Sequence, residues 1–133
     1  MVWSAYPPSR SDMPLSAQRV FKTKWFNKAA QAAGISDAEP HKVARQLMQG
    51  LGDDLGGNVW KKRLDQNRKR GIVLNKAGRC WFFVFLFAKR DRDNIDAPEL
   101  AAFRKLASDF GRCARADLDR LVELKAFVEV CHD

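Results

Sequence analysis

Apolar residues recur at helical spacing in two segments near the beginning of the chain. The first, Trp25–Ala33, is rich in alanine and is followed by Gly34, a residue that favours the backbone conformation found just after a helix. The second follows the capping-box pattern Ser36–Glu39 and continues to about Leu51, although Pro40 favours a start slightly later than the pattern indicates. We expect these two helices to form a hairpin that packs against a sheet.

Shorter apolar segments predict strands. Arg19–Lys24 alternates polar and apolar residues and suits a short edge strand. Two further strands, Asn58–Leu64 and about Arg70–Asn75, precede the apolar run Cys80–Lys89. The tight link Lys76–Gly78 predicts that the last two strands form an antiparallel hairpin.

The run Cys80–Lys89 is apolar on both faces. Strict alternation divides its large side chains between one face, with Trp81, Phe83, Phe85 and Phe87, and the other, with Phe82, Val84 and Leu86. A strand of this kind belongs in the middle of a sheet that is covered on each face.

The last third of the chain predicts helices again. Asp96–Glu99 is a second capping signal, and apolar residues from Leu100 to Phe110 mark one helical face. A shorter helix is expected around Asp117–Leu124, and Phe127–Val130 suits a final edge strand. The predicted fold is therefore α+β, with an N-terminal helical hairpin packed on a small antiparallel sheet and with a C-terminal helix or helices.

The length of the chain fits one domain, which we expect over residues 19–133, after a disordered lead-in at residues 1–18. No apolar run approaches the roughly 20 residues that a membrane-spanning helix needs. The three cysteines are widely spaced and odd in number, which argues against a disulfide framework or a zinc site and favours a reducing compartment. We therefore expect a cytoplasmic protein that does not act at a membrane.

The positive charge is concentrated in one part of the chain. Between Trp60 and Arg92 there are eleven lysines and arginines and two aspartates, a net charge of +9 in a chain whose total is +8. The remaining residues are thus close to neutral. A basic charge confined to one part of a domain indicates a site for a polyanion, although a solvated basic face is the simpler alternative.

Familiar catalytic constellations are missing from the sequence. His41 falls in a predicted helix and His132 is the penultimate residue, so they do not suggest an acid–base pair. Carboxylates are scattered, and there is no glycine-rich phosphate loop and no metal-binding spacing. If the protein cleaves a polyanion, we expect it to use cationic side chains, with no metal and no cofactor.

Strand alternation gathers some of these cations. In Trp60–Leu64 it separates Lys61 and Arg63 from the large apolar residues, so that both cations should face water. Arg70 begins the next strand, and Arg90 follows the one after it. Three consecutive strands can thus bring four cations to one concave surface, where a phosphate would meet several charge-assisted donors.

Three segments of this chain resemble the RelE and HigB group of bacterial toxins. They are Arg19–Glu39, Gly56–Arg63 and Phe83–Ile95, and the resemblance as a whole covers about Arg19–Val130. It implies a RelE-like fold and a toxin that enters the ribosomal A site and cuts mRNA, with the 2′-hydroxyl beside the scissile phosphate as nucleophile. It also implies 70S ribosomes and mRNA as partners, together with a cognate antitoxin that is a small DNA-binding regulator.

The resemblance assigns roles to the four cations. Lys61 and Arg63 match the basic pair on the first hairpin strand of the family, with Lys61 as the candidate general base. Arg70 and Arg90 match the arginines that stabilise the developing negative charge. Five further residues are expected to bind RNA: Lys62, Arg68, Lys69, Lys89 and Arg92.

One position departs from the family pattern. Asp96 stands where many RelE toxins have a tyrosine that stacks on a base and aids catalysis. Trp60 or Trp81 is the candidate to stack instead, with packing in the core as the alternative for both. Two other functions therefore stay open, a ParE-like poison of DNA gyrase and a degenerate relative that only binds nucleic acid.

Overall fold

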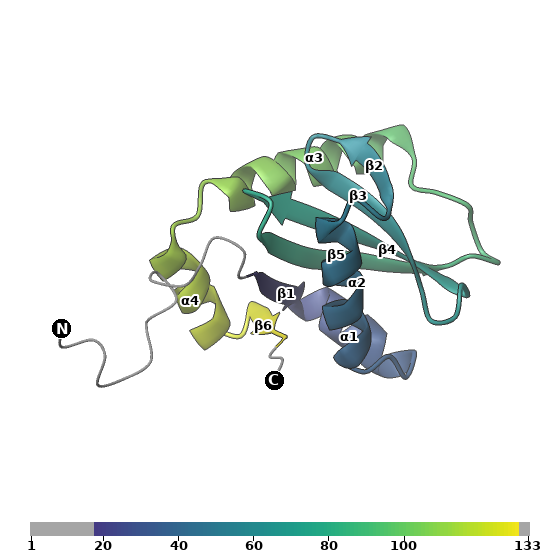
Figure 1. The fold of residues 1–133 in the computed structure, drawn as a ribbon, viewed down its shortest axis with the longest axis horizontal. Coiled ribbons are helices and arrows are strands. Elements are labelled where there is room, and N and C mark those ends of the chain that lie inside the picture. The colour runs from purple at the N-terminus through teal and green to yellow at the C-terminus, as the bar shows by residue number, and fades with distance from the viewer. Residues whose placement is uncertain (1–17, 131–133) are drawn as a thin grey trace.

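A computed structural model describes residues 18–130, which form an α+β fold with one six-stranded sheet and four helices (Figure 1). The strands are β1 (Arg19–Thr23), β2 (Asp53–Gly56), β3 (Val59–Leu64), β4 (Lys69–Lys76), β5 (Cys80–Ala88) and β6 (Phe127–Glu129). The helices are α1 (Lys24–Ala32), α2 (Ala38–Met48), α3 (Ala97–Gly111) and α4 (Arg115–Glu123). The predicted α+β class is confirmed, whereas most of the predicted lead-in lies outside the described residues.

The sheet order is β2-β3-β4-β5-β1-β6, and β1 pairs parallel to β5. The predictions of an edge strand at Arg19–Lys24 and of a purely antiparallel sheet are therefore wrong. The reason is that Val20 and Phe21 are both fully buried, one on each side of the sheet, and a strand buried on both faces needs neighbours on both edges. The short strand β6 forms the edge beyond β1, as its sequence predicts.

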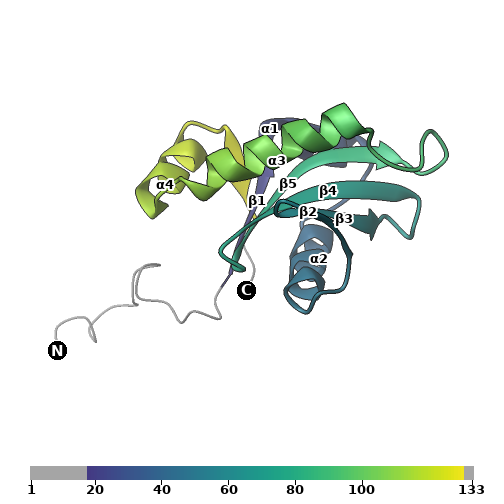
Figure 2. The same cartoon turned by 90° about the horizontal axis from the view of Figure 1, so that it is seen from above.

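The predicted N-terminal helical hairpin is also wrong, because the described chain begins with β1 and the two following helices pack on strands. Helix α1 contacts β5 and β1, while α2 contacts β1 and β3. Phe26 of α1 and Leu47 of α2 share one core cluster with Phe83 of β5. We call this side of the sheet the α2 face, and the opposite side, covered by α3 and α4, the α3 face (Figure 2).

Strand β5 lies inside the sheet with cover on both faces, as predicted, but its alternation is interrupted. Ile72 of β4 pairs with Phe85 and the next residue, Val73, pairs with Phe83, so a β-bulge lies at Val84. Beyond the bulge, Phe85 and Phe87 pack on the α3 face with Phe82. The predicted division of β5 into two strictly alternating faces is therefore wrong from Phe85 onward.

The sequence predicts capping boxes before α2 and before α3, and only the one before α3 forms. Asp96 accepts a hydrogen bond from the Glu99 N–H, and the Glu99 side chain returns to the Asp96 backbone, which confirms the capping box before α3. Helix α2 instead starts at Ala38, and the Asp37 carboxylate pairs with the buried ammonium of Lys22. The later start agrees with the position of proline in this segment.

No described helix is long and apolar enough to cross a membrane. Cys80 and Cys113 are free thiols, and burial raises the pKa of Cys80 above its usual range.

Candidate functional site

The hairpin of β3 and β4 carries three of the four predicted catalytic residues on one face. Arg63 and Arg70 are direct cross-strand partners, and Lys61 pairs with Ile72 two positions further along. Ile72 belongs to the core of the α3 face, and residues two apart on a strand share a face. Lys61, Arg63 and Arg70 therefore project from the α3 face, and we call them the cationic face.

The two β3 residues of the cationic face differ in exposure. Arg63 is exposed, as its sequence position predicts, and it pairs with no carboxylate of the described residues. The side chain of Lys61 is only 16% exposed, and its ammonium lies 3.9 Å from the Asp53 carboxylate of β2. The prediction that both cations face water is thus right for Arg63 and wrong for most of the Lys61 side chain, because the unpredicted strand β2 lies beside it.

Arg70 is held by its own hairpin. Its Nη1 donates to the backbone oxygens of Asn67 and Lys69, each at 3.1 Å. A guanidinium carries five N–H donors, so these bonds orient the side chain and leave further donors for a ligand.

Arg90 is not part of the cationic face. It lies two residues beyond β5, and its side chain is 88% exposed, with the Asp91 carboxylate 3.8 Å away. The preceding residue, Lys89, donates its N–H to the Arg68 oxygen at 2.9 Å, which brings this turn beside the β3–β4 loop. The structure therefore places three predicted cations on one face and the fourth at the end of the same sheet.

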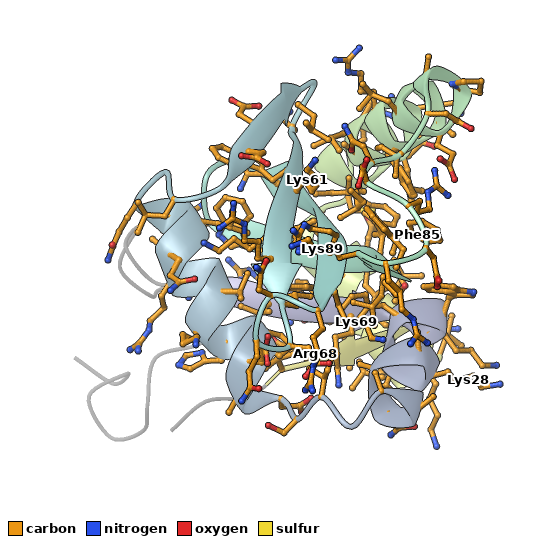
Figure 3. All side chains as sticks on the ribbon, turned by 90° about the vertical axis from the view of Figure 1, so that its right-hand side faces the viewer. Lys28, Lys61, Arg68, Lys69, Phe85 and Lys89 are labelled. Carbon is orange, nitrogen blue, oxygen red and sulfur yellow. The ribbon has the colours of Figure 1, made fainter. Side chains whose placement is uncertain are left out.

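A cavity of about 690 Å³ opens at this end of the sheet. It is lined by residues of the β3–β4 loop, of the turn after β5 and of the end of α1: Ala33, Asp65, Asn67, Arg68, Lys69, Ala88, Lys89, Arg90 and Asp93. Figure 3 looks onto this end and shows Lys61, Lys89, Lys69 and Arg68 following one another down the centre of the view. Four cations thus share the cavity with two aspartates.

The β3–β4 loop has an unusual backbone. Residues 65–67 are not glycine, yet all three adopt positive φ angles of 54°, 54° and 71°. The Glu39 carboxylate accepts a hydrogen bond from the Asp65 N–H, and Arg68 forms an ion pair with the Asp65 side chain. Such a backbone persists where its surroundings fix it, so these contacts hold the loop in the shape that presents Arg68 to the cavity.

Two of the predicted RNA-binding residues lie away from the cavity. Lys62 projects from the α2 face, where burial, and next the charge of Arg63, lower its pKa. Arg92 forms two hydrogen bonds to the Glu99 carboxylate, and its guanidinium carbon lies 5.4 Å from the centre of the Phe87 ring. Arg92 therefore fastens the segment after β5 to the start of α3.

The Arg92–Glu99 pair predicts a pH dependence of stability. The hydrogen bond from Arg92 lowers the pKa of Glu99 in the folded protein. The pair should stabilise the fold fully above the unfolded pKa of glutamate, about 4.3, and lose its effect as the pH falls through the lower folded pKa. Thermal unfolding should be measured from pH 7 to pH 3. At pH 7 the Glu99→Gln variant should have a lower melting temperature than the wild type, and this gap in melting temperature should narrow in acid. Glu123→Gln, at an exposed site, is the control, and a gap that stays constant with pH would contradict the assignment.

The tryptophans proposed for base stacking lie in the core. Trp81 is 3% exposed, and Trp60 packs against the same cluster, so the core alternative is correct for both. Trp25 is 51% exposed and stacks on Phe85 with ring centres 5.1 Å apart. The sequence interpretation did not single it out, although Trp25 falls outside the apolar stripe of its own helix.

Within residues 18–130, no three His, Cys, Asp or Glu side chains are grouped so that they could hold a metal ion. A search of curated proteins found no match to this chain. The family model described as the RelE toxin of the RelE/RelB toxin–antitoxin system matches residues 18–130, which is most of the chain. The chain therefore belongs to the RelE toxin family and is a RelE-like toxin of a toxin–antitoxin system.

Proposed function

We propose that this toxin is a ribosome-dependent endoribonuclease that cuts mRNA by attack of a 2′-hydroxyl on the adjacent phosphate. The observation that carries the proposal is the cross-strand pair Arg63–Arg70, with Lys61 two residues away on the same face. Two neighbouring guanidinium groups match the oxygens of a phosphodiester, because each can donate two parallel hydrogen bonds.

In this mechanism Lys61 takes the proton from the 2′-hydroxyl. Of the four predicted catalytic residues it is the only one that can lose a proton in a protein, because arginine stays charged. Its low exposure keeps the amine close to the sheet, where the attacking hydroxyl would lie beside the phosphate on Arg63 and Arg70. Arg90 reaches in from the rim and stabilises the negative charge that develops on the phosphate oxygens.

The cavity at the end of the sheet extends the site along the RNA. Arg68, Lys69 and Lys89 line it, and each would contact a phosphate beside the one that is cut. Most of the affinity of such contacts is independent of sequence, which suits a toxin that acts on many messages. The partners in this proposal are the 70S ribosome, mRNA and a cognate antitoxin, the small DNA-binding regulator implied above, and the site of action is the cytoplasm.

One observation favours a second candidate, a relative that binds nucleic acid without cutting it. Asp96, which stands in place of the family tyrosine, is used as the N-cap of α3 and accepts a hydrogen bond from Glu99. A side chain committed to a cap is not placed to protonate the leaving oxygen. Cleavage then requires another acid or a slower protonation by water.

Translation-coupled cleavage in a purified system distinguishes these functions. We expect mRNA to be cut only when it is translated, with a cyclic or 3′-phosphate on one product and a 5′-hydroxyl on the other. An mRNA that lacks the 2′-hydroxyl at the cut position should stay intact. Binding to ribosomes without cleavage would favour the non-cutting relative, and DNA breaks with intact mRNA would favour a gyrase poison.

A further inference from the structure

Trp25, the first tryptophan among the described residues, lies at the start of α1 and is half exposed. Its ring stacks on Phe85 with an interplanar angle of 29° and a distance of 5.1 Å between centres. One face of the indole is therefore covered by Phe85. Because 51% of the residue is nevertheless exposed, the opposite face is open to another planar group.

The ring beneath Trp25 is fixed by the fold. The Phe85 ring centre lies 5.9 Å from that of Phe87 in the same strand and 5.7 Å from that of Phe103 in α3. Phe87 belongs to the core of the α3 face, and Phe103 packs against that core. Trp25 and Phe85 thus form an aromatic platform, anchored below and open above.

The platform lies on the same face as the cations of the site. Phe85 pairs with Ile72, which pairs with Lys61, so these three residues form one row across β5, β4 and β3. Phe87, Arg70 and Arg63 form the next row. The bulge at Val84 creates this arrangement, because without it Phe85 would project from the α2 face.

Positive charge also surrounds Trp25 on its own helix. Lys24 precedes it, and Lys28 lies one turn later, where a helix places neighbouring side chains. Both lysines are exposed, and neither pairs with a carboxylate within residues 18–130. In Figure 3, Phe85 and Lys28 both lie to the right of the central line of cations.

We propose that Trp25 is a base-binding residue, whose open face stacks on a nucleobase of single-stranded RNA while the cationic face binds the phosphates. A nucleotide combines a flat apolar base with a negative phosphate a short distance away, which matches a platform bordered by lysines and arginines. The identity of the ligand rests on the proposed function. The geometry of the platform does not.

The test is binding of a labelled single-stranded RNA whose 2′-O-methyl groups prevent cleavage, measured by fluorescence anisotropy with the full chain at several salt concentrations. Trp25→Ala should weaken binding about tenfold, because it removes one stacked base, and should leave the salt dependence unchanged. Trp25→Phe should restore most of the affinity. Arg63→Gln should instead lower the slope of log K against log salt by about 0.7, the value for one phosphate contact.

Leu124→Ala is the matched control, since Leu124 is a large apolar residue that is 61% exposed at the end of α4 and belongs neither to the platform nor to the cationic face. It should bind RNA as the wild type does. The proposal is overturned if Trp25→Ala binds the RNA as tightly as the wild type does, or if the substitution weakens binding of an abasic oligonucleotide as much as binding of the RNA. It is also overturned if the substitution weakens only the binding of the antitoxin. Base binding that depends on Trp25 in a protein that cuts no mRNA would support the platform and refute the proposed ribonuclease activity.

Discussion

Replacing Arg90 by alanine should lower the rate of ribosome-dependent mRNA cleavage by about 100- to 1,000-fold, the loss typical when one preorganised donor to a developing negative charge is removed. The fold should not change, because the Arg90 side chain is 88% exposed and its nearest carboxylate, Asp91, is 3.8 Å away. A surface pair of this kind contributes about 0–1 kcal/mol to stability. The effect should therefore appear in the cleavage rate, while the melting temperature stays within a few degrees of the wild type.

Arg112→Ala is the control for a general loss of positive charge. Arg112 is also exposed and also pairs with an aspartate, Asp109, but it lies at the far end of α3 from the cavity. The Arg112→Ala variant should cleave mRNA at nearly the wild-type rate in single-turnover measurements on programmed ribosomes. If both variants cut equally fast, Arg90 has no role in the chemical step.

Replacing Phe82 by alanine should destabilise the fold by about 3–5 kcal/mol, the usual cost of removing a buried phenylalanine ring. Phe82 is completely buried. Its ring stacks on Phe21 of β1 at 5.2 Å and contacts Phe110 of α3 at 4.9 Å and Phe127 of β6 at 5.7 Å. It therefore joins the central strand to three elements that are distant in sequence, and the hole would be lined by side chains that cannot all move into it.

Urea unfolding of the purified protein measures this effect. The comparison is Trp25→Ala, which also removes an aromatic ring but from a half-exposed position, where the ring stacks on Phe85. Its cost should be about 1 kcal/mol. A Phe82→Ala protein as stable as Trp25→Ala would show that the four-ring contact is not a main support of the α3 face.

Local patterns in the sequence determined several elements correctly. Capping chemistry depends on residues three positions apart, so Asp96 and Glu99 identified the start of α3 without any knowledge of the rest of the chain. The same holds for the hairpin of β3 and β4, in which alternation alone separates Lys61 and Arg63 from the apolar side. The concentration of positive charge between Trp60 and Arg92 was likewise visible from composition.

Features that depend on partners distant in sequence were missed. Strand β1 reads as an edge strand because only two of its residues are large and apolar, and its burial on both faces is set by β5 and β6. Strand β2, with two aspartates among four residues, has no strand-like pattern and exists through its pairing with β3. Long-range backbone pairing of this kind has no signal in local hydrophobic periodicity.

The sequence by itself determined the α+β class, the segments of the central hairpins, the capped start of α3 and the cations that β3 and β4 carry. Only the tertiary structure decided that β1 lies inside the sheet, that Arg90 lies at its rim and that Trp25 rests on Phe85. Pairing with β5 and β6, which are distant in sequence, places β1 inside the sheet, and the bulge at Val84 accounts for the Trp25–Phe85 contact: one extra residue in β5 shifts the register against β4 and turns Phe85 toward the α3 face. A shift of one residue reverses every later side chain of a strand, and it is set by packing across the sheet rather than by the residues of the strand alone.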